Sequence, residues 1–282
     1  MYVVRTDLAI EAADTSDGKL PEGVSVDQDT ADGIERTTVR IRTEGAAERL
    51  GRPIGDYYTF EAPIQHADEA LVAQVSEALG QLLPDGTILV VGLGNRSITP
   101  DALGPATAHQ VIATRHIPAE TSRAVGLPPL RPVCSLAPGV MGQTGIETSD
   151  IIKAVVADVK PAAVVVVDAL AARGVGRLGA TVQLSNSGIA PGAGVENCRT
   201  ELSERTLGVP VLSLGIPTVV DGGTLVQDLA GKEDVGRAAR ALMVTPRDID
   251  RVIEKGARVL AEALNRALFP NLGAEDIALL MD

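Results

Sequence analysis

The amino-acid sequence predicts an α/β fold of three layers, in which helices cover both faces of a mainly parallel, mixed central sheet. From residue 87 onward, short runs of β-branched residues alternate with helical segments, and such alternation indicates β-α-β crossovers and parallel strands. Apolar residues make up 45% of the 282 residues, whereas aromatic residues make up 2% and tryptophan is absent. The core must therefore be built from valine, leucine, isoleucine and alanine, which suits a parallel sheet covered by helices.

The N-terminal part predicts an arm followed by a small β-rich extension. Residues 1–30 are polar and acidic without a clear period, which predicts a loosely held arm with an accessible backbone. The next expected elements are a half-solvated strand over 36–42, a short helix over 44–50, a strand over 56–61 and an amphipathic helix over 66–83. We expect a single α/β domain over 8–282, within which residues 30–62 form a β-rich subregion.

The remaining chain predicts alternating strands and helices. Strands are expected over 87–91, 132–136, 163–167, 181–184 and 209–214, and helices over 102–114, 149–159, 226–243 and 248–268. After the first of these strands, Thr99 and Pro100 are typical of an N-cap followed by proline at the first helical position. Asp101 would then lie in the first turn of a helix.

The charge balance and the cysteine content exclude several classes of protein. There are 25 basic and 37 acidic residues, and a net charge of −12 opposes binding to nucleic acid or to an anionic membrane. Two cysteines, Cys134 and Cys198, are too few for a disulfide scaffold and lack the spacing of metal ligands, so we expect buried thiols in a reducing compartment. No signal peptide and no apolar stretch near the ~20 residues of a membrane span is visible. These features predict a cytoplasmic protein.

Two aspartates are expected at one edge of the sheet. Asp101 follows the strand over 87–91, and Asp168 follows the strand over 163–167 directly. Open α/β sheets bind their ligands at the carboxyl ends of their strands. Carboxylates that share a partly desolvated cleft repel each other, so that one keeps its proton as a general acid and the other acts as a general base. A turn or a helix cap is the alternative for each aspartate alone, and proximity does not follow from the sequence.

Three glycine-rich loops are expected at the same edge, over 92–95, 138–148 and 187–197. Glycine lets backbone amides approach a ligand closely, which suits a phosphate, an oxyanion or an extended peptide. No loop matches G-x-x-x-x-G-K-[ST] or a complete G-x-G-x-x-G between strand and helix, which disfavours a phosphate. A tight turn stays the alternative for each loop.

Motifs of other hydrolases are missing. The three histidines, His66, His109 and His116, lie in or beside predicted helices away from this edge, and we expect surface or packing roles for them. Neither a G-x-S-x-G nucleophile elbow nor an H-E-x-x-H motif is present, and neither cysteine has an evident histidine partner. For a hydrolase, the carboxylates are therefore the remaining candidates.

Nine longer motifs together resemble the bacterial germination protease (spore protease) family. They are GLGN (92–95), TPDALGP (99–105), PGVMG (138–142), TGIET (144–148), DALAAR (168–173), SGI (187–189), PGAGV (191–195), GIPTVVD (215–221) and LMVTP (242–246). The resemblance extends from Arg5 almost to the end of the chain, and the shared order of several long motifs makes it specific.

The resemblance implies a homotetrameric, sequence-specific endopeptidase that degrades small acid-soluble spore proteins during germination, in the forespore or spore core. The family's two essential aspartates fall on Asp101 and Asp168. Family members are made as zymogens that remove their own N-terminal segment; here the matching bond joins Asp7 to Leu8, and residues 1–7 form a candidate pro-segment. The implied fold is phosphorylase/hydrolase-like and related to the hydrogenase maturation proteases, which bind a metal with two acidic residues and a histidine. No histidine here clearly matches that ligand, so we expect catalysis without a metal or other cofactor.

Further residues are candidates for binding the peptide or for supporting the two aspartates. Backbone amides of the glycine loops are expected to bind the peptide or its oxyanion. The candidates for this group are Gly92, Gly94, Asn95, Thr99, Gly142 and Thr144. Glu147 and Arg173 are candidates for orienting the aspartates or holding an acidic substrate side chain, with a salt bridge or a helix cap as the alternative. A metal-dependent protease of the maturation type and a non-catalytic peptide-binding relative are the rival functions.

Overall fold

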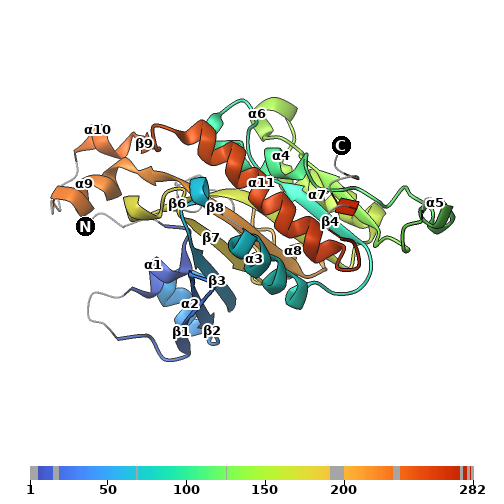
Figure 1. Cartoon of the computed structure of the whole chain (residues 1–282). Helices are drawn as coiled ribbons and strands as arrows, with labels where there is room; N and C mark the ends of the chain where they lie inside the picture. The colour runs from blue at the N-terminus through green and yellow to red at the C-terminus, as the bar shows by residue number, and fades with distance from the viewer. Residues whose placement is uncertain are drawn as a thin grey trace.

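A mixed sheet of nine strands runs through the part of the chain that the computed structural model describes (Figure 1). The described residues are 6–14, 19–67, 69–124, 126–190, 200–230, 236–273, 276–277 and 280. The strands are β1 (Val24–Ala31), β2 (Ile34–Ile41), β3 (Gly55–Glu61), β4 (Ile88–Gly92), β5 (Val133–Leu136), β6 (Ala163–Ala172), β7 (Thr181–Ser185), β8 (Val211–Asp221) and β9 (Met243–Val244). Their order is β1-β2-β3-β7-β8-β6-β4-β5, and β9 pairs with β8.

The parallel strands form one side of this sheet. β4 is parallel to both β5 and β6, and β6 is parallel to β8. The other pairs, from β1 through β3 and β7 to β8 and also β8 with β9, are antiparallel. This topology confirms the predicted mixed sheet.

Helices cover both faces of the sheet. The α-helices are α1 (Ala9–Ala13), α2 (Glu44–Leu50), α3 (Glu69–Leu82), α4 (Leu103–Ala108), α5 (Ala119–Ala124), α6 (Met141–Thr144), α7 (Thr148–Val159), α8 (Glu204–Leu207), α9 (Gly222–Ala230), α10 (Arg237–Arg240) and α11 (Ile249–Leu268). The 3₁₀ helices are η1 (Ile64–His66), η2 (Thr99–Asp101) and η3 (Val175–Arg177). Among the described helices, none is long and apolar enough to cross a lipid bilayer.

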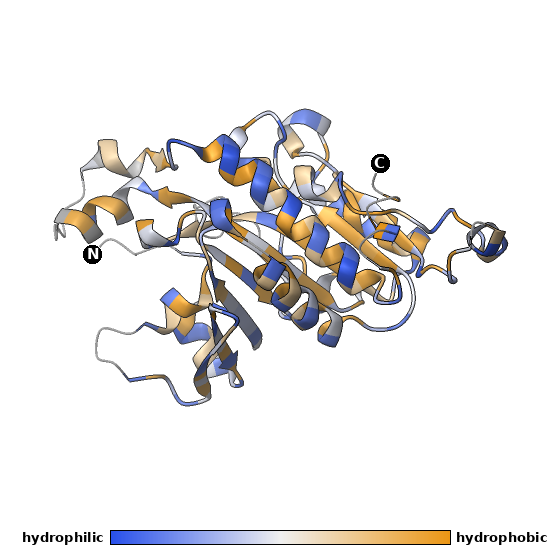
Figure 2. Ribbon diagram, in the orientation of Figure 1, coloured by the Kyte–Doolittle hydropathy of each residue, from blue (hydrophilic) through white to orange (hydrophobic). Residues whose placement is uncertain are grey.

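The two faces have separate hydrophobic cores. On the first face, α3, α4 and α11 pack on the sheet, and Val165 and Val167 belong to their cluster. On the second face, α7 and α8 contribute side chains to a cluster that contains Val164 and Val166. Figure 2 shows the central strands as largely hydrophobic, whereas α11 carries both hydrophobic and hydrophilic residues. The alternation of valines between the two clusters explains why the apolar run over 163–167 is unbroken.

The N-terminal extension differs from the prediction. β3 pairs with β7, so the extension continues the main sheet, and α1 and α2 pack on it. Residues 1–30 were expected to form a loose arm, which is wrong for their described part because it includes α1 and β1. β1 is an edge strand whose side chains are mostly exposed, and it therefore lacks the apolar alternation that would have revealed it.

Two predicted helices differ from the observed ones. The helix expected over 102–114 ends at Ala108, because the Asn265 side chain from α11 accepts a hydrogen bond from the Ile112 backbone N–H (3.0 Å). The helix expected over 226–243 is replaced by the shorter α9 and α10 and by β9, which pairs with β8. In both cases a distant segment binds the backbone that the local pattern assigned to a helix.

Tyr57 on β3 connects a buried ring to the loop before that strand. Its hydroxyl donates to the Pro53 carbonyl oxygen (2.7 Å), and burial raises the pKa of Tyr57 to about 12. Tyr57→Phe should lower the free energy of unfolding by about 1 kcal/mol near neutral pH, because that hydrogen bond is lost. Since the unfolded-state pKa is about 10, the parent should lose more stability than the variant between about pH 10 and pH 12. Urea unfolding at neutral and alkaline pH measures this; a constant difference would contradict it.

Candidate active site

The chain reverses its winding direction between β4 and β6. β5 lies on one side of β4 and β6 on the other. The connection from β4 to β5 passes over the first face through α4, and the connection from β5 to β6 passes over the second face through α7. In doubly wound sheets this topology opens a crevice outside the carboxyl ends of the two strands, where ligands bind. The segments that carry Asp101 and Asp168 both meet this crevice.

Asp101 is held by the loop that follows β4. The Asn95 backbone N–H donates to its carboxylate Oδ2 (2.7 Å). Gly94 has a φ of +116°, and a Cβ atom there would lie 2.0 Å from the Asp101 carbonyl oxygen, so only glycine permits this turn. Ile98 is the N-cap of η2, so the expected N-cap at Thr99 is wrong, whereas Asp101 lies in the first turn of this 3₁₀ helix as predicted. The Thr218 hydroxyl of β8 donates to the Pro100 carbonyl (2.7 Å) and ties η2 to the sheet.

Asp168 lies within β6 and not after it, because β6 continues five residues beyond the apolar run, to Ala172. It is 7% exposed, and its Oδ1 accepts a hydrogen bond from the Ala169 backbone N–H (2.9 Å). By strand alternation its side chain is on the second face with Val164 and Val166. Gly215 of β8 is its register partner.

A stretch of three residues, 93–95, joins the surroundings of the two aspartates. At one end, the Leu93 N–H donates to the carbonyl of Val167, directly before Asp168 (2.8 Å). At the other end, Asn95 binds the Asp101 carboxylate. A Cβ atom at Gly104 would lie 2.2 Å from the Leu93 oxygen and 2.4 Å from the Val167 oxygen, so α4 packs directly on this junction. The structure thus brings the two aspartate-bearing segments together.

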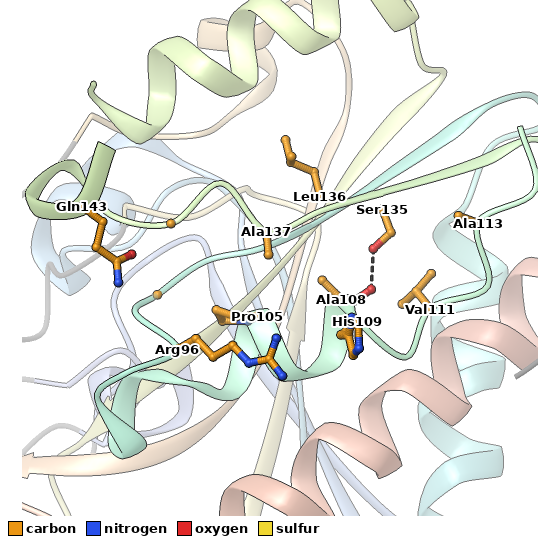
Figure 3. Close-up of a pocket in the computed structure, with 12 residues that line it drawn as sticks. Arg96, Pro105, Ala108, His109, Val111, Ala113, Ser135, Leu136, Ala137 and Gln143 are labelled. Atoms are coloured by element: carbon orange, nitrogen blue, oxygen red, sulfur yellow. Dashed lines mark hydrogen bonds between the residues drawn. The ribbon is translucent and has the colours of Figure 1, made fainter. Parts of the chain in front are cut away.

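A cavity of about 490 Å³ opens beside this junction, as Figure 3 shows. Its described lining consists of Gly94, Arg96, Pro105, Ala108, His109, Val111, Ala113, Ser135, Leu136, Ala137, Gly139 and Gln143. Arg96 and His109 are the ionisable residues of this lining, and both are exposed. His109 was expected to have only a surface or packing role, and its local sequence carries no signal for a cavity.

β5 lies at an edge of the sheet and lines this cavity with Ser135 and Leu136. β5 is the edge strand, and the Ile88 N–H donates to the Pro132 carbonyl (3.0 Å). In a parallel ladder, alternate residues bind the neighbouring strand, so the backbone of Ser135 faces away from β4. Such an edge can pair with an extended peptide.

The other loop candidates have varied surroundings. A Cβ atom at Gly92 would lie 2.0 Å from the Gly104 oxygen, so Gly92 serves the packing of α4. Gln143 of the second loop donates to the Asn95 Oδ1 (2.8 Å) and connects the two loops. Thr144 is hydrogen-bonded within its own loop, whereas nothing lies within 4 Å of a Cβ atom built at Gly142. Glu147 directly precedes α7 and is exposed.

The residues at the predicted cleavage bond are seated on the second face of the sheet. The Asp7 N–H donates to the Ala171 carbonyl (2.7 Å), and its carboxylate accepts from the Ala171 N–H (2.8 Å). Leu8 is 0% exposed, and its hydrophobic cluster includes Leu170 and Ala172 of β6. This part of the chain is therefore anchored, and the expectation of a loosely held arm with an accessible backbone is wrong for it.

Two further polar groups hold this segment. The Gln183 Nε2 donates to the Asp7 carbonyl (2.9 Å), and its Oε1 accepts from the Ala9 N–H (2.7 Å). The Glu11 carboxylate accepts from the backbone N–H groups of Arg173 (2.7 Å) and Gly174 (2.9 Å). Arg173 thus meets an acidic side chain through its backbone. Sequence reasoning missed Gln183; its position between the apolar Val182 and Leu184 indicates only a strand with two different faces.

Leu8→Ala should release the arm locally. Removing the side chain from its buried cluster costs about 2–5 kcal/mol, and an arm near the chain end can open without global unfolding. We expect faster amide hydrogen exchange at residues 6–14 and unchanged exchange in α3. Leu20→Ala is the matched control, since Leu20 is 42% exposed. Unchanged exchange of the arm in the Leu8 variant would contradict this seating.

Some candidates lie outside the described residues. These are residues 1–5 of the pro-segment, residues 191–197 of the third glycine loop, and Cys198. Within the described ranges, no group of three or more His, Cys, Asp and Glu side chains is arranged to hold a metal ion.

The family model and three curated relatives that match this chain carry the description germination protease. A family model described as germination protease matches residues 4–231. The chain is 39% identical to a germination protease of Clostridium perfringens over 325 residues, covering 98% of each chain. It is 37% identical to a germination protease of Caldanaerobacter subterraneus over 314 residues, covering 97% of each chain. It is 46% identical to a germination protease of Halalkalibacterium halodurans over 248 residues, covering 80% of this chain and 66% of the relative. Among solved structures, a NiFe hydrogenase maturation protease from Thermococcus kodakarensis matches 66% of this chain and 98% of its own, with a TM-score of 0.38 and 19% identity.

Proposed function

Because this chain belongs to the germination protease family, we propose that it is an endopeptidase that uses Asp101 and Asp168 to hydrolyse small acid-soluble spore proteins during germination. The observation that carries the proposal is the junction over 93–95, which binds the Asp101 carboxylate at one end and β6 beside Asp168 at the other. Two carboxylates at a topological switch point have the chemistry that peptide hydrolysis without a covalent intermediate requires.

The two aspartates divide the proton transfers. One carboxylate takes a proton from water, whose oxygen attacks the peptide carbonyl carbon. The other, protonated at the start, donates its proton to the leaving amine as the carbon–nitrogen bond breaks. Nothing in this scheme requires a metal or another cofactor.

The cavity beside Gly94 suits an acidic peptide. Arg96 supplies positive charge on a protein whose net charge is −12, which favours an acidic substrate side chain at this place. The outward backbone of Ser135 offers hydrogen bonds to an extended chain. Both features support spore proteins with acidic cleavage sites as substrates.

The seated arm supports self-processing between Asp7 and Leu8. Asp7 is hydrogen-bonded to β6 three residues beyond Asp168, so the arm lies on the strand that carries a proposed catalytic group. Residues 1–7 are then the pro-segment of a zymogen. The family resemblance further supports a homotetramer in the forespore or spore core.

Mass spectrometry combined with a peptide assay tests this function. The purified chain, incubated over time, should convert to a species that begins at Leu8, and it should cleave a synthetic peptide with the sequence of residues 4–11 after the aspartate. A peptide of the same composition in scrambled order is the control. Both reactions should persist after thorough chelation; loss of both on chelation would favour the metal-dependent alternative. If neither conversion nor peptide cleavage occurs under any activating condition, the proposal is wrong.

A further inference from the structure

We propose that Gln183 binds the carbonyl oxygen of the Asp7–Leu8 bond during self-cleavage, and that hydrolysis of separate peptides does not depend on it. This inference rests on the proposed function. Nothing in the local sequence marks Gln183 as part of an active site, and it is 6% exposed.

The Gln183 carboxamide spans Leu8. It donates to the carbonyl of the residue before Leu8 and accepts from the N–H of the residue after it (2.9 and 2.7 Å). One residue of a parallel β-strand binds its neighbour with the same pair of groups. The side chain thus acts as a one-residue strand that sets the register of the arm, and the oxygen it binds belongs to the bond predicted to be cleaved.

Asp168, Gly215 and Gln183 form one row across β6, β8 and β7. Asp168 pairs with Gly215, and Gly215 pairs with Gln183. The neighbours of Gly215 and Gln183 along their strands belong to the cluster of the first face, so all three residues of the row belong to the second face. A Cβ atom at Gly215 would lie 2.8 Å from the Leu170 side chain, so glycine at this place makes room for Leu170, which packs in the cluster of Leu8. The Cα atoms at the two ends are about 10 Å apart, two strand spacings.

Asp7 connects β6 with Gln183 at one end of this row. Its backbone N–H binds Ala171 of β6, and its carbonyl binds Gln183 of β7. β8 lies between these two strands, and Ala171 stands three residues beyond Asp168 on β6. The Asp7 carboxylate is fixed by the Ala171 N–H, and Leu8 is fully buried, so the arm cannot slide along the row.

The chemistry of bond cleavage needs a donor at this oxygen. When water adds to the Asp7 carbonyl carbon, the π electrons move to the oxygen, which becomes an oxyanion next to the Gln183 Nε2. One aspartate takes the proton from water, and the other protonates the Leu8 nitrogen as the bond breaks, giving a carboxyl group at Asp7 and an amine at Leu8. A preorganised neutral donor stabilises such an oxyanion, and losing one typically costs about 10²- to 10³-fold in rate.

The remainder of the arm stays in place after cleavage. Ala9 and Ala13 of α1 pack in the cluster of the N-terminal extension, and Glu11 keeps its bonds to Arg173 and Gly174. None of these contacts involves residues 1–7. Leu8 therefore keeps its buried place and Ala9 keeps its bond to the Gln183 Oε1, so the Leu8 side of the cleavage position stays filled. A separate peptide must then reach the aspartates from the cavity beside Gly94.

Two variants separate binding of the oxygen from a structural role. Gln183→Leu removes both hydrogen bonds, whereas Gln183→Glu keeps the acceptor for the Ala9 N–H and loses the donor when ionised. Both should slow self-cleavage by about 10²-fold or more at neutral pH. For Gln183→Glu, the rate relative to the parent should rise as pH falls, because a protonated carboxyl donates again. Gln74→Glu is the matched control, since Gln74 is also buried and donates to the Ala31 carbonyl.

A chain produced to begin at Leu8 provides the second readout. Its hydrolysis of the peptide with the sequence of residues 4–11 should change less than about twofold in either Gln183 variant, a loss far below that of an oxyanion donor. Unchanged self-cleavage in the variants, or equal slowing of both reactions, would overturn the inference while leaving the proposed function intact. A parent chain that neither processes itself nor cleaves the peptide would overturn both. Thermal unfolding of each variant verifies that it is folded.

Discussion

Asp101→Asn and Asp168→Asn should each lower the rates of self-cleavage and peptide hydrolysis by about 10²- to 10⁴-fold. An amide has nearly the shape of the carboxyl group, but it neither accepts a proton from water nor donates one to the leaving amine. The oxygen of an amide can still accept the hydrogen bonds that Asn95 and Ala169 donate to the native carboxylates. The fold should therefore persist, and single-turnover rates followed by intact mass, together with thermal unfolding, measure the two effects.

Asp150→Asn is the control for these substitutions. Asp150 is exposed in the first turn of α7, and its replacement also removes one negative charge from the protein. Its cleavage rate should stay close to that of the parent. Near-parental activity of either active-site variant would exclude that aspartate from proton transfer.

Gly104→Ala should be a strongly destabilising single-methyl change near the site. The added Cβ would meet the backbone oxygens of Leu93 and Val167 at 2.2 and 2.4 Å, and neither can move without distorting β4 or β6. We expect the free energy of unfolding to fall by about 3–5 kcal/mol, the range of severe overpacking. Cleavage should fall as well, because displacement of α4 moves Asp101. Urea unfolding gives the first quantity and intact mass the second.

Gly80→Ala is the matched control for that change. Gly80 lies inside α3, and nothing lies within 4 Å of a Cβ atom built there. Alanine should raise stability by up to about 1 kcal/mol through its higher helix propensity. If the two substitutions had similar effects, close packing at Gly104 would not be the cause.

The centre of the fold could be predicted because its signals are local. The apolar runs of β4 and β6 can each be recognised from their own residues, and parallel pairing places the carboxyl ends of the two strands at one edge of the sheet. Topology alone also predicted that the segments that carry Asp101 and Asp168 meet at that edge. Gly94 also had a local signal, since the strand-glycine-helix pattern indicates a turn that needs positive φ.

The remaining features depend on contacts between segments far apart in sequence. Leu8 stands in a polar arm, and its burial requires partners on β6, more than 160 residues away. In the sequence, Gln183 has no feature beyond those of a strand residue, and only the structure shows its hydrogen bonds with Asp7 and Ala9. The early end of α4 is set by Asn265, and His109 lines a cavity only because α4 packs beside β5. The pattern of apolar residues within a short stretch of sequence cannot reveal contacts between such distant segments.

Arg177 gives the seated arm a thermodynamic connection to the N-terminal extension. Its guanidinium is shared by two anions, Glu11 of α1 (3.5 Å) and Glu61 of β3 (2.6 Å). Two anions that share one cation compete for it, so withdrawal of Glu11 leaves the full charge of Arg177 to Glu61. Departure of the arm and tightening of β3 against η3 are thus linked equilibria, and added salt, which screens both ion pairs, weakens that linkage.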